Sequence, residues 1–138
     1  MTSATRLTSL RYVLIATGLI FAFGIYPLTQ IWPSGWSWGA GPSHYRMMIL
    51  GVYFVLGLFL LAASRDPLAN RSLIWFTVWS SVLHSLVMAV ESLMDPAEVG
   101  HLFGDVPALL LVGIALAALT PRAAALTVSA SAGGRRAA

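Results

Sequence analysis

The stretch RSLIWFTVWSSVLHSLVMAVESLM, residues 71–94, combines the length of a membrane span with a row of polar side chains. A transmembrane helix needs about 20 mostly apolar residues, and this stretch supplies them. At about 100° per residue, its polar side chains from Thr77 to the adjacent Asp95 fall within an arc of roughly 140°. This polar face comprises Thr77, Ser80, Ser81, His84, Ser85, Glu91, Ser92 and Asp95. Because polar groups that face lipid find no partner, we expect this face to turn into a helix bundle.

The composition of the whole chain also indicates a membrane protein. Its 138 residues are 58% hydrophobic and only 9% charged, whereas a soluble domain carries about 25% charged residues. Cysteine and lysine are both absent, which excludes thiolate metal sites, cysteine nucleophiles and Schiff-base cofactors. The net charge is +3, but the arginines stand mostly singly beside apolar runs, so we expect a lipid bilayer and no nucleic acid as partner.

Four apolar segments predict an all-α, four-helix transmembrane bundle with up-down topology. The predicted spans are about 11–32, 46–64, 71–94 and 101–120, within one domain of residues 1–122. The first apolar run is followed by no small-x-small cleavage site, so we interpret it as an uncleaved span. Short connections predict that spans two, three and four are sequential antiparallel neighbours. We expect Asp105 to cap the fourth span, with Pro107 in its first turn, and residues 123–138 to form a disordered cytoplasmic tail.

The placement of arginines predicts the orientation. Cytoplasmic loops carry an excess of arginine and lysine, and only Arg46 lies on the other side of the predicted spans. Both termini are therefore predicted to be cytoplasmic, in a plasma membrane. The seven arginines on that side are Arg6, Arg11, Arg65, Arg71, Arg122, Arg135 and Arg136.

Ionisable side chains in the outer half of the bundle form the candidate site. His84 lies near the middle of its span, and Glu91 lies about 10.5 Å further out. His101 and Asp105 are four residues apart and share a face if that segment is helical. Because ionisable residues inside a membrane usually serve a function, we predict a polar, outward-opening cavity for a small or lipid-like ligand or a proton. The candidate residues are His84, Glu91, His101, Asp105, Ser81 and Tyr53.

Other roles for these residues stay open. Glu91, His101 and Asp105 are possible ligands for zinc, iron or manganese, although their spacing matches no metal motif, and we predict no cofactor. We expect binding or proton movement rather than covalent catalysis. In the rival interpretation, the polar groups only pin helices together: His84 bonds a serine or a carbonyl, and Glu91 pairs with Arg46 or His101. The chain would then be an accessory or scaffold subunit of a larger membrane complex, or a homo-oligomer.

Three segments carry a resemblance to a known family. YRMMILGVYFVLGLFLLAASRDP, WSSVLHSLVMAVES and HLFGDVPALLL occupy residues 45–67, 79–92 and 101–111. They resemble an uncharacterised family of small bacterial four-span membrane proteins, and more loosely the DoxX-like membrane proteins. The resemblance implies a four-helix fold in a bacterial inner membrane and implies no chemistry. The architecture is also similar to the sterol isomerase and sigma-2 receptor group, in which histidine and carboxylates surround a ligand pocket that opens into the membrane.

Overall fold

The computed structural model of the chain describes residues 2–37 and 43–121, and within these ranges every regular element is a helix. Four helical stretches there are long and apolar enough to cross a membrane, as predicted. They are Ser3–Ile31, His44–Ala63, Arg71–Met94 and Pro96–Leu119. The predicted orientation depends in part on Arg122, Arg135 and Arg136, which lie outside the described residues, as does the predicted tail.

The first stretch begins eight residues before the predicted span. It consists of α1 (Ser3–Leu19), a π-helical segment η1 (Ile20–Gly24) and α2 (Ile25–Ile31), and it is followed by the short helix α3 (Pro33–Trp36). Thr2 caps α1, because its side-chain oxygen accepts a hydrogen bond from Thr5 N. Hydropathy marks only the part of a helix that faces lipid, so the polar first turns of α1 were not predicted as helix.

The boundaries of the second and third spans are close to the predicted ones, whereas the fourth stretch begins five residues before its predicted start at residue 101. α4 runs from His44 to Ala63 and α5 from Arg71 to Met94. The fourth stretch starts as a 3-10 helix, η2 (Pro96–Leu102), and continues as α6 (Asp105–Leu119).

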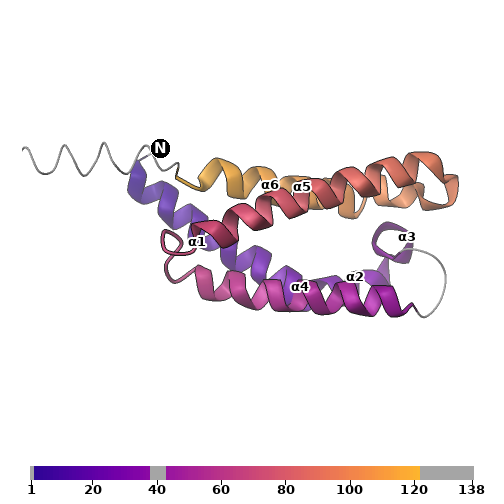
Figure 1. Ribbon diagram of the computed structural model, residues 1–138, viewed down its shortest axis with the longest axis horizontal. Coiled ribbons are helices and arrows are strands. Elements are labelled where there is room, and N and C mark those ends of the chain that lie inside the picture. The colour runs from indigo at the N-terminus through magenta and orange to yellow at the C-terminus, as the bar shows by residue number, and fades with distance from the viewer. Residues whose placement is uncertain (1, 38–42, 122–138) are drawn as a thin grey trace, which may run out of the picture.

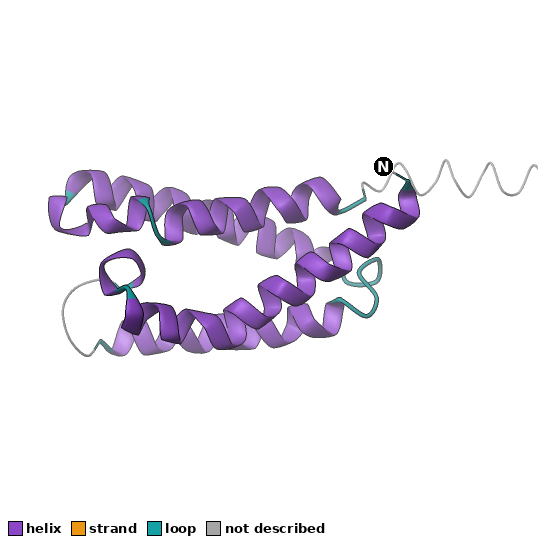
Figure 2. Ribbon diagram, turned by 180° about the vertical axis from the view of Figure 1, so that it is seen from behind, coloured by secondary structure: helices purple, strands orange, loops and turns teal. Residues whose placement is uncertain are grey.

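The helices form two pairs, α5 with α6 and α4 with the stretch from α1 to α2, which Figures 1 and 2 show from opposite sides. α5 packs along α6, as predicted for neighbours in sequence, but α4 packs chiefly against α1 and η1 and touches α5 over only a short stretch. The prediction that spans two, three and four are sequential antiparallel neighbours therefore holds along spans three and four, whereas spans two and three meet only over a short stretch. α1 crosses between the pairs, with its first turns against α6 and its later turns against α4.

One end of the bundle is tightly packed. We call it the closed end, and it contains the fully buried Leu10, Leu14, Leu60, Ile74 and Leu116. Here the Arg6 guanidinium donates hydrogen bonds to the carbonyls of Ala118, Leu119 and Thr120, at 2.6, 3.0 and 3.2 Å. A cation at the C-terminus of a helix satisfies its free carbonyl groups and its dipole. The opposite end, beside α3 and η2, is the α3 end.

Large apolar side chains cover the outside of the bundle. Phe59, Leu83, Leu111 and Ile114 each expose between 59% and 68% of their surface. A water-soluble monomer rarely displays so continuous an apolar surface, so the exterior matches a lipid environment.

Glycines bring α1 and α4 into backbone contact. A Cβ atom placed on Gly57 would lie 2.5 Å from Ala22 N and 2.6 Å from Gly18 O. Small residues allow membrane helices to approach in this way, because packing rather than the hydrophobic effect drives their association. The contact draws α4 toward α1 and away from α5.

We predict that Gly57→Ala destabilises the protein by about 1–3 kcal/mol, because the added methyl group overpacks a backbone contact. Gly51→Ala is the matched control on the same helix, since a Cβ there meets no atom within 4 Å. Thermal unfolding in detergent, followed by circular dichroism, measures both variants. Equal stability of the two would contradict the importance of this contact.

Candidate functional site

A cavity of about 490 Å³ lies between α4 and α5 in the half of the bundle nearer the α3 end. Its side walls are apolar and include Ile49 and Leu50 from α4 and Val87 and Met88 from α5. Polar side chains lie at both ends of these walls. The cavity exists where α4 and α5 separate after their short contact.

The inner end of the cavity is formed by Tyr53 and His84. Tyr53 Oη lies 3.3 Å from His84 Nδ1, a hydrogen bond between α4 and α5. The two rings meet edge to face with centroids 5.9 Å apart, and Phe21 packs edge-on against Tyr53 at 4.8 Å. The structure therefore brings together two candidate residues that are 31 positions apart in sequence.

The outer end of the cavity carries two opposite charges, Arg46 and Glu91. Arg46 precedes Tyr53 by seven residues and Glu91 follows His84 by seven. Because α4 and α5 run antiparallel (Figure 1), both charges lie about 10.5 Å from the Tyr53–His84 pair, toward the α3 end.

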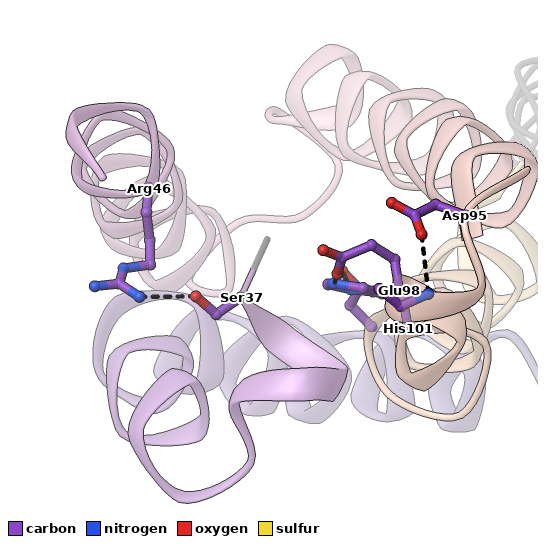
Figure 3. A network of polar contacts seen from close by, with 7 residues as sticks. Ser37, Arg46, Asp95, Glu98 and His101 are labelled. Atoms are coloured by element: carbon purple, nitrogen blue, oxygen red, sulfur yellow. Dashed lines mark hydrogen bonds and ion pairs between the residues drawn. The ribbon is translucent and has the colours of Figure 1, made fainter. Parts of the chain in front are cut away.

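Arg46 and Glu91 do not pair with each other. In the described parts of the chain no ion pair within 4.0 Å joins Glu91 to Arg46 or to His101, so the predicted structural role of Glu91 is not seen. The Arg46 guanidinium instead donates through Nη1 to Ser37 Oγ at 2.7 Å, as Figure 3 shows.

His101 is held between two carboxylates. Its side chain is 1% exposed, and its Nδ1 lies 3.0 Å from Asp105 Oδ2. Its Nε2 lies 3.4 Å from Glu98 Oε2 (Figure 3). The predicted helix cap at Asp105 is wrong: Gly104 occupies the N-cap position and no side chain caps the first turn. The Asp105 carboxyl group turns back toward His101, its neighbour four positions earlier.

The short helix α3 packs on η2 through glycines. A Cβ on Gly104 would collide with Gly35 O, and one on Gly100 with Ser34 O. This contact brings Trp36 and Ser37 to the cavity wall. Nothing in the sequence pattern indicated that a loop between spans one and two would reach span four.

Two serines of the predicted polar face serve helix packing. Ser85 Oγ donates to Val106 O at 2.8 Å and ties α5 to α6. Ser81, a predicted site residue, is 2% exposed and lies opposite Gly113 on α6, where a Cβ on the glycine would be 4.0 Å from Ser81 Cβ. It does not line the cavity.

The proposed metal ligands do not converge. His101 and Asp105 are in contact, but within the described residues no ion pair of 4.0 Å or less joins Glu91 to His101. Within residues 2–37 and 43–121 no group of three or more histidine and carboxylate side chains could hold a metal ion.

Four apolar helices around a partly polar cavity define a multi-pass helical membrane protein. The chain belongs to a family of unknown function (DUF6632), whose model matches residues 3–138. No curated protein and no solved structure matches the chain.

We predict that Asp105→Asn lowers thermal stability by about 1 kcal/mol or more, because it removes the charge that faces a buried imidazole. The matched control is Asp95→Asn, at an exposed position where the amide oxygen can still accept from Ala97 N. Detergent unfolding midpoints measure both variants. A loss for Asp95→Asn as large as that for Asp105→Asn would argue against a special role for the His101 contact.

Proposed function

We propose that this membrane protein binds a small or lipid-like amphipathic ligand in the cavity between α4 and α5. The volume of about 490 Å³ lies within the range of about 300–1,000 Å³ typical of small-molecule sites. The observation that carries the proposal is the distribution of polarity. Apolar walls separate a hydrogen-bonding inner end, Tyr53 and His84, from a charged outer end, Arg46 and Glu91.

Proton movement is a second function that the same cavity supports. His84 contacts a tyrosine hydroxyl, and His101 contacts a carboxylate through each ring nitrogen. Such groups accept and release protons readily. In either function the protein binds a ligand or moves a proton and performs no covalent catalysis.

We further propose a bacterial inner membrane as the location, with both termini in the cytoplasm. The described arginines Arg6, Arg11, Arg65 and Arg71 lie on or beside the closed end, and Arg46 lies at the α3 end. This distribution follows the positive-inside rule. The looser likeness to DoxX-like proteins, and a role as an accessory subunit or homo-oligomer, stay predictions.

A cavity-filling substitution tests ligand binding. Met88→Trp places a larger side chain in the cavity, whereas Leu83→Trp places it on the outer surface of the same helix, where Leu83 is 63% exposed. We expect native mass spectrometry of gently purified wild-type protein and of Leu83→Trp to show the same bound molecule, and Met88→Trp to lose it. A folded Met88→Trp protein that keeps the full adduct would rule out the cavity as the binding site.

The absence of cysteine allows a direct test of orientation. Ala69→Cys lies between α4 and α5 at the closed end, and Ala97→Cys lies in η2 at the α3 end; both alanines are exposed. With intact cells, a membrane-impermeant maleimide should label Ala97→Cys and should label Ala69→Cys only after lysis. The reverse pattern would place the termini outside.

A further inference from the structure

Two pairs of residues line the cavity at two levels, and only the inner pair is in direct contact. Tyr53 and His84 are joined by a hydrogen bond of 3.3 Å. Two helical turns further out, Arg46 and Glu91 occupy equivalent positions with opposite charges, yet no ion pair joins them in the described structure. The open pair therefore presents a positive wall on α4 and a negative wall on α5.

Ser37 holds Arg46 on its own side of the cavity. The Ser37 residue is 6% exposed, and its hydroxyl accepts from Arg46 Nη1 at 2.7 Å. A guanidinium has five N–H donors, so most of them stay available for another acceptor. The nearby Trp36 Nε1 is a further buried donor, with no hydrogen-bond partner in the described part of the chain. Arg46 and Trp36 both line the cavity.

The opposite wall is acidic. Glu91 is exposed and lines the cavity from α5, and Asp105 lines it from α6, where its Oδ2 contacts His101. Asp105 Oδ1 has no hydrogen-bond partner of ordinary geometry in the described structure, although the Val106 N–H lies near the carboxyl group. A purely anionic ligand would meet repulsion from these carboxylates, and a purely cationic one would meet repulsion from Arg46.

We propose that Arg46 and Glu91 bind the two ends of a zwitterionic headgroup that has the chemistry of phosphoethanolamine. This proposal rests on ligand binding in the cavity and names the ligand class. The phosphate oxygens accept hydrogen bonds from Arg46, and the primary ammonium donates to Glu91. Charge-assisted hydrogen bonds of both kinds are stronger than neutral ones, and guanidinium geometry matches phosphate oxygens in pairs.

The apolar walls accept the hydrophobic part of such a ligand. Between the outer and inner pairs, Ile49, Leu50, Val87 and Met88 line a section about 10.5 Å long. The cavity volume of about 490 Å³ holds a headgroup and the first part of an acyl chain, and the rest of the chain stays in the bilayer.

The test uses delipidated full-length protein in detergent, with lipid binding followed by native mass spectrometry. Phosphatidylethanolamine, phosphatidylcholine and phosphatidylglycerol of identical chains are compared. Phosphatidylethanolamine should bind about tenfold more tightly than the other two lipids. Phosphatidylcholine lacks the N–H donors of the ammonium group, and phosphatidylglycerol lacks a cation. Arg46→Gln and Glu91→Gln should each remove about tenfold in affinity, and Glu91→Gln should also abolish the preference over phosphatidylglycerol.

Control variants remove one positive and one negative charge at positions outside the cavity. Arg65→Gln lies at the closed end and Asp95→Asn lies outside the cavity lining, and both should bind as the wild type does. Soluble glycerophosphoethanolamine distinguishes the two sources of the headgroup. Competition at similar affinity would support a site for the free zwitterion, and no competition would support a site for the lipid.

Three results would overturn the proposal. The first is that phosphatidylglycerol binds as tightly as phosphatidylethanolamine and that Glu91→Gln changes neither affinity, because this result would indicate a site for anions. The second is phosphatidylethanolamine binding that neither charge variant weakens. The third is a direct ion pair: both single variants are less stable without lipid, and the exchange Arg46→Glu with Glu91→Arg restores stability. In each case, loss of bound ligand in Met88→Trp would still support the cavity as a binding site.

Discussion

The backbone contact between Gly18 and Gly57 decides which helices of this bundle pair. Because neither residue has a side chain, the backbones of α1 and α4 approach each other more closely than they could if side chains stood at these positions. α5 is left to pack along α6, where Gly113 and Ser85 supply the close approach and the hydrogen bond. The cavity between α4 and α5 follows from this pairing, since each of the two helices satisfies its packing elsewhere.

The polar groups of the cavity depend on a second close contact, between α3 and η2. Gly35 and Gly104 let a loop segment pack against the start of the fourth span, and that packing places Ser37 beside Arg46. At the other end of the molecule, Arg6 binds the last carbonyls of α6. The bundle is thus secured at the closed end and at α3, and the space between α4 and α5 lies between these two attachments.

Periodicity and hydropathy in the sequence predicted much of the fold. They identified four spans, and the 100° spacing on residues 71–94 correctly indicated that Thr77, Ser81 and Ser85 are buried. They could not predict which helices pair, because that depends on glycine contacts between distant segments. The side chain of Asp105 was assigned to a cap, since helix boundaries were inferred from composition; the contact with His101 depends on η2 being helical. Arg46 was used to infer orientation and as a possible partner of Glu91, but not as a site residue, although its spacing of seven residues from Tyr53 matches that of Glu91 from His84.

The energetics of ionisable groups in a membrane favour a functional explanation for the open pair. Where charges only need to hold helices together, a closed ion pair or a well-packed apolar pair performs as well or better. Arg46 and Glu91 do neither, although they face each other across one cavity in a chain with only 9% charged residues. Tyr53 and His84, two turns further in, show that α4 and α5 come close enough for direct contact. The separation of Arg46 from Glu91 therefore reflects the divergence of α4 and α5 toward the α3 end. The proposed ligand, which carries both charges, would stabilise that divergence by contacting each helix.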